Sequence, residues 1–138
     1  LDTNRTLPYN LNLLNDNKSE TIIFCSNKKF QDNKTSHCKY LVVNEKDEKL
    51  DPKHILIRLG ELGVTSLLIE GGANVMQSFL NQNLIDEFHL YTSLKENQDL
   101  DIKNPFFIND KWKIKDEKFF ENDQLIILEN KEKCLLES

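Results

Sequence analysis

The stretch of sequence that decides the fold reads Ser66-Leu67-Leu68-Ile69-Glu70-Gly71-Gly72-Ala73-Asn74-Val75-Met76. Residues 65–69 form a short apolar run, which predicts a strand buried on both faces, as in a parallel sheet. Residues 73–83 carry apolar side chains at helical spacing and predict a helix. The two glycines lie between these elements. The sequence therefore predicts a turn at the carboxyl edge of a sheet that leads directly into a helix.

A turn of this kind is suited to binding an anion. Glycines let a phosphate approach the backbone closely, and the first amides of a helix are unpaired and lie at the positive end of its dipole. Ligands of open α/β sheets bind at this edge. The alternative is a tight turn with no ligand. The pattern leaves both readings open, because the sequence has neither the G-x-G-x-x-G fingerprint nor a Walker lysine.

Glu70 is the unusual residue of this stretch because a carboxylate directly follows an apolar run. We expect it at the tip of the strand, partly buried and on the same edge as the glycines. A carboxylate in such a place is either paired within the protein or in contact with a ligand. The pattern does not choose between these two roles.

The residues before this stretch predict further elements of the same kind. Apolar, β-branched runs at 21–25 and 39–43 predict two more buried strands. Asp51 as the cap and Pro52 as the first helical residue predict a helix that ends before Gly63. The Asn-rich segment between Leu11 and Ser19 is typical of turns.

The residues after the stretch predict an antiparallel end to the sheet. Residues 85–94 alternate apolar and polar side chains and predict a strand, and a loop is expected at 95–104. Residues 112–120 and 124–129 predict a hairpin. The tail from Lys131 is expected to be loose.

The order of these elements predicts the fold class. It is α/β, with a mostly parallel central sheet, flanking helices and an antiparallel C-terminal edge. The length of 138 residues favours one domain that spans residues 1–138.

Composition excludes several classes of function. A net charge of −5 and a pI near 5.2 give no clustered basic surface for nucleic acid. No apolar run is long enough to span a bilayer, and no signal-peptide pattern is found. The cysteines Cys25, Cys38 and Cys134 form no C-x-x-C pair, so we expect a reduced, cytoplasmic protein with Cys25 in the core. No pair of histidines has the spacing of metal ligands, and no metal is expected.

A longer pattern gives a family resemblance. The segment from Leu67 to Tyr91, Leu-Leu-Ile-Glu-Gly-Gly-Ala-Asn-Val-Met-Gln-Ser-Phe-Leu-Asn-Gln-Asn-Leu-Ile-Asp-Glu-Phe-His-Leu-Tyr, resembles the signature of the riboflavin biosynthesis reductase domain, the C-terminal half of the bifunctional deaminase/reductase. The matching residues are Glu70, Gly71, Gly72, Phe79, Leu80, Leu84, Ile85, Asp86, Glu87 and Tyr91. A weaker match is Leu1-Asp2-Thr3 with the following Leu7-Pro8.

The resemblance implies a dihydrofolate-reductase-like fold and a reaction. That reaction is the NADPH-dependent reduction of 5-amino-6-(5-phosphoribosylamino)uracil, a phosphorylated ribosylaminopyrimidine, to the ribitylamino product. Glu70 would contact the substrate. The residues that would hold NADPH are Thr3, Gly71, Gly72, Ala73, Asn74, Val75, Met76, Gln77 and Ser78. The family also implies a homodimer and a cis peptide between Gly71 and Gly72, whereas Asp86 and Glu87 are interpreted as structural. No residue is assigned as the proton donor.

The sequence also departs from the family. Ser93-Leu94 replaces the usual Ala-Pro, and the zinc motifs of the deaminase half are absent. Leu1-Asp2-Thr3 reads like the end of a strand, so we expect the chain to be a fragment whose upstream half is missing. Two alternatives stay open: a related pterin or pyrimidine reductase of the same fold, and a truncated, non-catalytic dimerisation domain. For the second, Trp112 and Phe119-Phe120 would suit sheet packing or a dimer seam.

Overall fold

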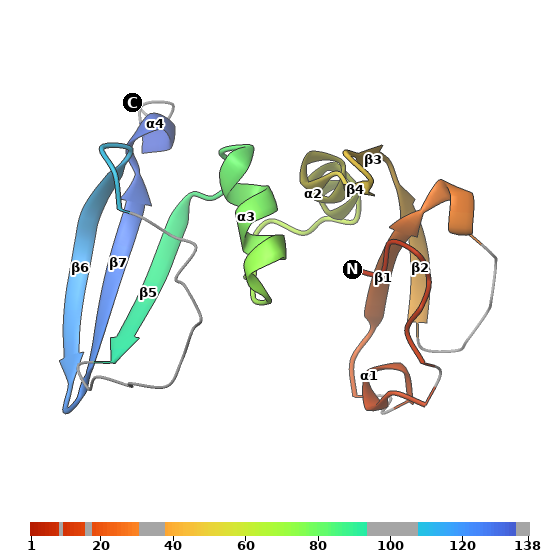
Figure 1. The fold of residues 1–138 in the computed structure, drawn as a ribbon, viewed down its shortest axis with the longest axis horizontal. Helices are drawn as coiled ribbons and strands as arrows, with labels where there is room; N and C mark the ends of the chain where they lie inside the picture. Colours follow the sequence, from red (N-terminus) through yellow and green to blue (C-terminus); the bar gives the residue numbers. More distant parts are fainter. Residues whose placement is uncertain (9, 16–17, 31–37, 94–107, 135–138) are drawn as a thin grey trace. The chain divides into compact units, whose positions relative to one another are not determined.

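The computed structural model describes residues 1–8, 10–15, 18–30, 38–93 and 108–134 (Figure 1). The chain divides into two compact units, Leu1–Leu68 and Ile69–Ser138. The loop predicted at 95–104 lies outside the described residues.

The first unit is built on a parallel pair of strands. β1 (Thr21–Ser26) and β2 (Cys38–Val43) pair with Ile23 opposite Tyr40 and Cys25 opposite Val42. The side chains of Cys25 and Val43 are fully buried. The two strands predicted here are thus confirmed, although most of β2 is only half-buried, and Cys25 lies in the core as expected.

A short hairpin and a helix complete the core of this unit. β3 (Glu45–Lys46) and β4 (Lys49–Leu50) are antiparallel, and the two turn residues between them have positive φ angles, as tight two-residue hairpins require. α2 (Pro52–Glu61) follows, and the Asp51 side chain accepts a hydrogen bond from the Lys53 amide at 3.2 Å. The predicted cap and helix are confirmed. The buried core residues are Phe24, Val43, Leu50 and Ile55.

The segment between α2 and the second unit contradicts a prediction. Residues 65–69 form neither helix nor strand, and the Leu67 and Leu68 side chains are 42% and 80% exposed. A strand exists only where a neighbouring strand completes its hydrogen bonds, and apolar composition supplies none of these. The boundary between the two units falls between Leu68 and Ile69. The buried strand expected here is therefore wrong for this structure.

The second unit contains one helix and a three-stranded antiparallel sheet. α3 (Ala73–Asn81) precedes β5 (Glu87–Ser93), and β6 (Trp112–Phe120) and β7 (Asp123–Asn130) form a hairpin. The strand order is β5-β7-β6, so β7 is central. The helix, the strand after it and the hairpin were all predicted. A register shift between Ile114 and Asp116 marks a bulge in β6.

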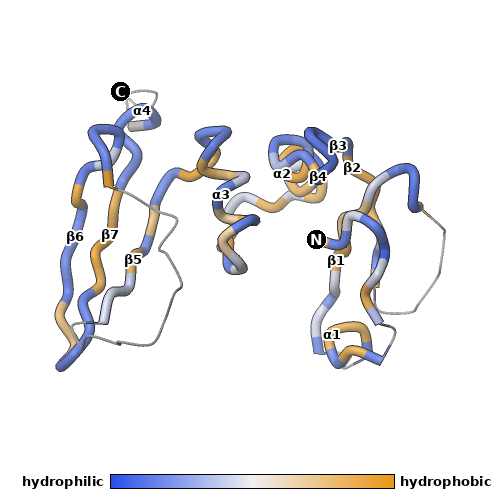
Figure 2. Tube along the Cα trace, viewed as in Figure 1, coloured by the Kyte–Doolittle hydropathy of each residue, from blue (hydrophilic) through white to orange (hydrophobic). Residues whose placement is uncertain are grey.

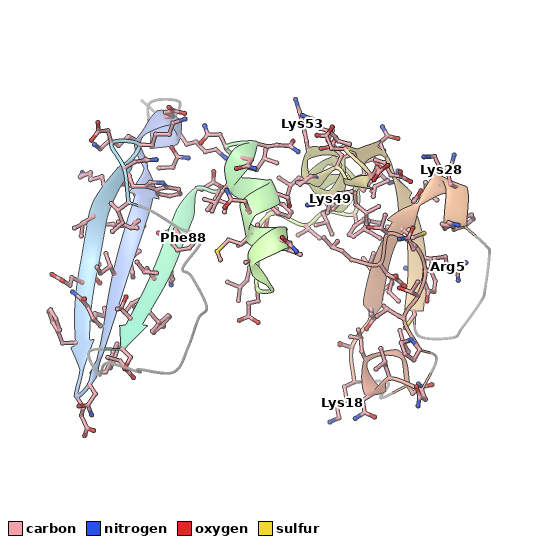
Figure 3. All side chains as sticks on the ribbon, in the orientation of Figure 1. Arg5, Lys18, Lys28, Lys49, Lys53 and Phe88 are labelled. Carbon is pink, nitrogen blue, oxygen red and sulfur yellow. The ribbon has the colours of Figure 1, made fainter. Side chains whose placement is uncertain are left out.

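The apolar residues of this sheet are concentrated in β7, as Figure 2 shows. Leu125 and Leu128 are buried on opposite faces of the strand. Phe88, which projects from β5 (Figure 3), meets Trp112 of β6 edge to face, with ring centroids 6.1 Å apart. Trp112 therefore has a packing role inside the sheet.

Three further expectations about the fold change. Among the described strands, β1 and β2 form the parallel pair and the other pairings are antiparallel. A mostly parallel sheet is therefore not found among the described strands, and the strand expected at 65–69 does not form. Short helices also replace two irregular segments: α1 (Asn12–Asn15) in the Asn-rich stretch, and α4 (Lys131–Cys134) where a loose tail was expected. A short 3-10 turn, Asn27–Lys29, follows β1.

Candidate functional site: the start of helix α3

The glycine turn before α3 has the backbone that only glycine adopts readily. Gly71 has a φ angle of +147°, which residues other than glycine rarely adopt. Gly72 is the N-cap of α3, in an extended conformation with φ −64° and ψ 160°. The peptide between them is trans. The expected cis peptide is thus wrong, because the positive φ angle of Gly71 makes the turn without it.

The first amides of α3 are available to a ligand. The Val75 and Met76 amides donate to the Gly72 carbonyl at 3.0 and 3.3 Å. Within the described residues, the amides of Ala73 and Asn74 donate to no acceptor, and no side chain caps the helix. A Cβ atom added at Gly72 would meet no heavy atom within 4 Å. The turn is therefore open, and two N–H groups at the positive end of a helix dipole can receive an anion.

The predicted cofactor residues of this segment fall into two groups. Gly71, Gly72, Ala73 and Asn74 are exposed, and the residues from Val75 to Ser78 are half-buried. The Ser78 hydroxyl donates to the Val75 carbonyl at 2.6 Å, and the Gln77 amide donates to Asn81 at 2.7 Å. These two polar side chains therefore make bonds inside the helix. The exposed group offers the better ligand contacts, through its backbone.

Glu70 differs from the expectation of partial burial. Its side chain is exposed. The strand expected to carry Glu70 to a sheet edge does not form among the described residues, so its carboxylate is not buried against a sheet. Among the described residues it makes no hydrogen bond or ion pair. A structural pairing of Glu70 is thus not found within this part of the chain.

Thr3 lies in the first unit and the glycine turn in the second. The Thr3 carbonyl accepts a hydrogen bond from the Ser26 amide at 3.2 Å, which holds it beside the end of β1. The neighbouring Asp2 is buried, and its carboxylate accepts hydrogen bonds from the Thr6 and Leu7 amides at 2.9 and 3.1 Å. These bonds order the backbone around Thr3 within its own unit.

Asp86 and Glu87 make surface ion pairs. Asp86 meets Lys133 at 2.6 Å. Glu87 meets Lys115 and His89, each at 2.6 Å, and hydrogen bonds from these two lower the pKa of the Glu87 carboxyl. These contacts agree with a structural role for both residues.

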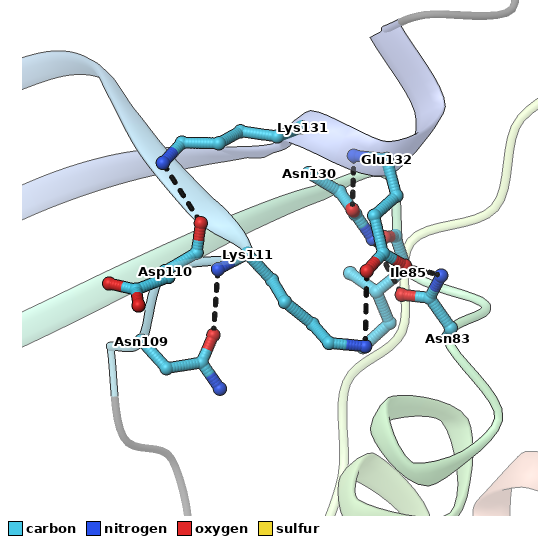
Figure 4. A network of polar contacts seen from close by, with 8 residues as sticks. All are labelled: Asn83, Ile85, Asn109, Asp110, Lys111, Asn130, Lys131 and Glu132. Atoms are coloured by element: carbon cyan, nitrogen blue, oxygen red, sulfur yellow. Dashed lines mark hydrogen bonds and ion pairs between the residues drawn. The ribbon is translucent and has the colours of Figure 1, made fainter.

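Sequence reasoning missed a polar network at the other end of α3 (Figure 4). Asn83 follows the helix with a φ angle of +54°, and its side chain bonds to Asn130 and Glu132, at 2.9 and 2.7 Å. An Asn just past a helix is a known signal for a left-handed cap. No local signal marks its partner, because Asn130 lies 47 residues further along the chain.

Two negative findings concern the described residues. No helix in this part of the chain is long and apolar enough to cross a membrane. In the same residues, no group of three His, Cys, Asp or Glu side chains is placed to hold a metal ion.

Comparison with known proteins gives a family and several relatives. Residues 1–93 match the family described as RibD C-terminal domain. The riboflavin biosynthesis protein RibD of Bacillus amyloliquefaciens is 35% identical over 94 residues, which is 66% of this chain and 25% of that protein. RibD of Buchnera aphidicola subsp. Baizongia pistaciae (strain Bp) is 33% identical over 60 residues, 44% of this chain and 16% of that protein. The chain thus spans about a quarter or less of these relatives.

Two solved structures have a similar fold. The riboflavin biosynthesis reductase Rib7 of Saccharomyces cerevisiae superposes with a TM-score of 0.67 and 18% identity, covering 94% of this chain and 66% of that one. A Thermotoga maritima diaminohydroxyphosphoribosylaminopyrimidine deaminase/5-amino-6-(5-phosphoribosylamino)uracil reductase gives a TM-score of 0.50 and 20% identity, covering 86% and 43%. At these identities the likeness concerns the fold.

Proposed function

Because this chain belongs to the RibD C-terminal domain family, we propose that it is part of a reductase that acts in riboflavin biosynthesis. Its substrate is 5-amino-6-(5-phosphoribosylamino)uracil, its product is the ribitylamino compound, and its cofactor is NADPH. The similar Thermotoga maritima protein is a reductase of the same uracil compound, which supports this substrate.

The observation that carries the proposal is the open start of α3. The amides of Ala73 and Asn74, which donate to no acceptor within the described residues, and the uncovered Gly72 suit a phosphate of a dinucleotide. The segment from Gly71 to Ser78 would bind this phosphate through its exposed first half. Thr3 is a further proposed cofactor-binding residue, and its backbone is ordered beside the end of β1.

The chain's own part in the reaction is binding and orientation. When bound, the nicotinamide supplies a hydride to C1′ of the ribosylamino group in its open imine form. The helix start would anchor a cofactor phosphate and so fix the distance from the nicotinamide to the substrate. Glu70 would contact the substrate, since its carboxylate is exposed next to that anchor. No residue is assigned as the proton donor.

The assembly and the setting are part of the same proposal. We propose a homodimer in the cytoplasm. The exposed aromatic side chains of β6, at the edge of the second unit's sheet, support the dimer.

Removing one amide tests the anion site. Ala73 is the first residue of α3, where proline is well tolerated, and the extended conformation of Gly72 suits the residue before a proline. Ala73→Pro deletes the Ala73 N–H group and should leave the helix intact. Loss of one hydrogen bond to a charged group should raise the Kd for NADPH by about tenfold or more. Titration of NADPH by its nicotinamide fluorescence measures this.

Ala73→Gly is the matched control, because it changes the same position and keeps the N–H group. Its Kd should stay close to that of the wild-type chain. Equal Kd values for the proline and glycine variants would show that the phosphate does not bind at the start of α3. Thermal unfolding of both variants establishes that each is folded during the titration.

A further inference from the structure

Asn130 is a buried polar side chain whose hydrogen-bonding groups are all used. It is 1% exposed. Its Nδ2 donates to the Asn83 Oδ1 and to the Ile85 carbonyl, each at 2.9 Å. Its Oδ1 accepts from the Glu132 amide at 3.1 Å. A buried side-chain amide whose nitrogen and oxygen are both hydrogen-bonded holds its neighbours in fixed positions, because breaking any of these bonds leaves a buried polar group unpaired.

Both polar atoms of the Asn83 side chain bond to the last residue of β7 and to the helix α4 that follows it. Asn130 occupies its Oδ1, and its Nδ2 donates to the Glu132 carboxylate at 2.7 Å. The other oxygen of Glu132 pairs with Lys111 at 3.3 Å. The end of α3 is thus tied to β7 and α4 by side chains far away in the sequence (Figure 4).

The two ends of α3 differ in their contacts. Phe79 is the buried residue of the helix and lies in its second half. Residues 71–74, at the other end, are exposed. Within the described residues of the second unit, the helix is therefore held at its C-terminal end, and the residues at its N-terminal end are exposed.

Because of this arrangement, the positions of the first N–H groups of α3 depend on the contacts at its C-terminal end. Nine residues at about 1.5 Å each make α3 about 13 Å long. A tilt of about 5° at the attached end moves the first amide by about 1 Å, and a displacement of that size in a binding group is costly.

We propose that Asn83 and Asn130 are positioning residues for cofactor binding. They act through α3 and set where the amides of Ala73 and Asn74 point. This inference rests on the proposed function, because it concerns the same helix start. It adds that the geometry of the anion site is fixed from the opposite end of the helix by residues that touch no ligand.

Asn83→Gly is the sharpest test. Glycine adopts the positive φ angle of this position without strain, so the backbone path stays and both side-chain bonds are lost. In the full chain, the Kd for NADPH should rise by about tenfold, equivalent to about 1.4 kcal/mol. Amides in the second half of α3 should also exchange with solvent faster in the absence of NADPH, while those of β5 and β7 should not change.

Two further variants separate positioning from a general loss of stability. Glu132→Gln keeps an oxygen that can accept the Asn83 Nδ2 bond, so its Kd should stay within about twofold of the wild-type value. Asp86→Asn removes the nearby ion pair between Asp86 and Lys133, which does not involve Asn83. Its Kd and its α3 exchange should be unchanged.

The outcomes are distinguishable when binding is measured well below the unfolding temperature. A lower unfolding midpoint for Asn83→Gly with an unchanged Kd would overturn the inference, since the network would then serve stability alone. If the wild-type chain binds NADPH and the α3 amides of Asn83→Gly exchange as slowly as those of the wild type, the inference is also overturned. Failure of the wild-type chain to bind NADPH would reject the proposed function itself, and the cofactor role of Asn83 with it.

Discussion

At the scale of a residue, Glu70 gives the clearest separation of stability from activity. Its carboxylate is exposed and makes no hydrogen bond or ion pair within the described residues. Glu70→Gln should therefore change the free energy of unfolding by no more than about 0.5 kcal/mol, as for other surface positions. The Kd for NADPH should stay the same and turnover of the ribosylaminopyrimidine should fall. A large loss of stability in urea unfolding would instead indicate a structural role.

At the scale of an element, the contacts of the β3–β4 hairpin should make the free energy of unfolding depend on pH in the acid range. The Ser26 hydroxyl donates a hydrogen bond to the Glu45 carboxylate, and the Lys28 ammonium pairs with the same carboxylate at 3.2 Å. Both contacts lower the pKa of the Glu45 carboxyl below 4.5. A lowered pKa in the folded state adds stability above pH 4.5, and this is lost as the pH falls through the folded pKa. In Glu45→Gln the free energy of unfolding should therefore decrease less steeply than in the wild type as the pH falls below 4.5. Ser26→Ala should also make this decrease less steep. Parallel profiles for wild type and Glu45→Gln would contradict this.

Elements with local signals were predictable, and elements that depend on distant partners were not. The Asp51 cap and Pro52 define α2 through bonds within a few residues. The hairpin of β6 and β7 has its turn between two strands that are adjacent in sequence. Residues 65–69 have the composition of a buried strand, but their pairing depends on other strands, and composition cannot supply these.

The features of the candidate site likewise divide into those set by neighbouring residues, which were predictable, and those set by distant residues, which were not. The turn at Gly71 and the helix start were predictable, because glycine torsions and helix amides are local properties. The burial of Glu70 was predicted wrongly, because it depended on the missing strand. Asn130 could not be predicted as a partner of Asn83, since nothing in either neighbourhood identifies a contact across 47 residues.

At the scale of the whole molecule, the edge strand β6 bears on the proposed dimer. Phe119 and Phe120 are 66% and 52% exposed on this strand, and exposed aromatic side chains are typical of interfaces. Phe119→Lys should shift the chain towards the monomer in sedimentation velocity, since burial of a charge at an apolar seam is unfavourable. Lys113→Ser, on the same strand, is the control and should leave the distribution unchanged. A wild-type chain that stays monomeric at every concentration would refute the dimer.

The open start of α3 has a chemical consequence of its own. From Gly71 to Leu84 the chain contains no Asp, Glu, His, Lys, Arg, Tyr or Cys, so this segment has no group that titrates. The partial positive charge at Ala73 and Asn74 comes from peptide dipoles, which do not change with acidity. Across the pH range in which the fold persists, the attraction of this segment for an anion therefore depends on the ionisation of the ligand and not on its own.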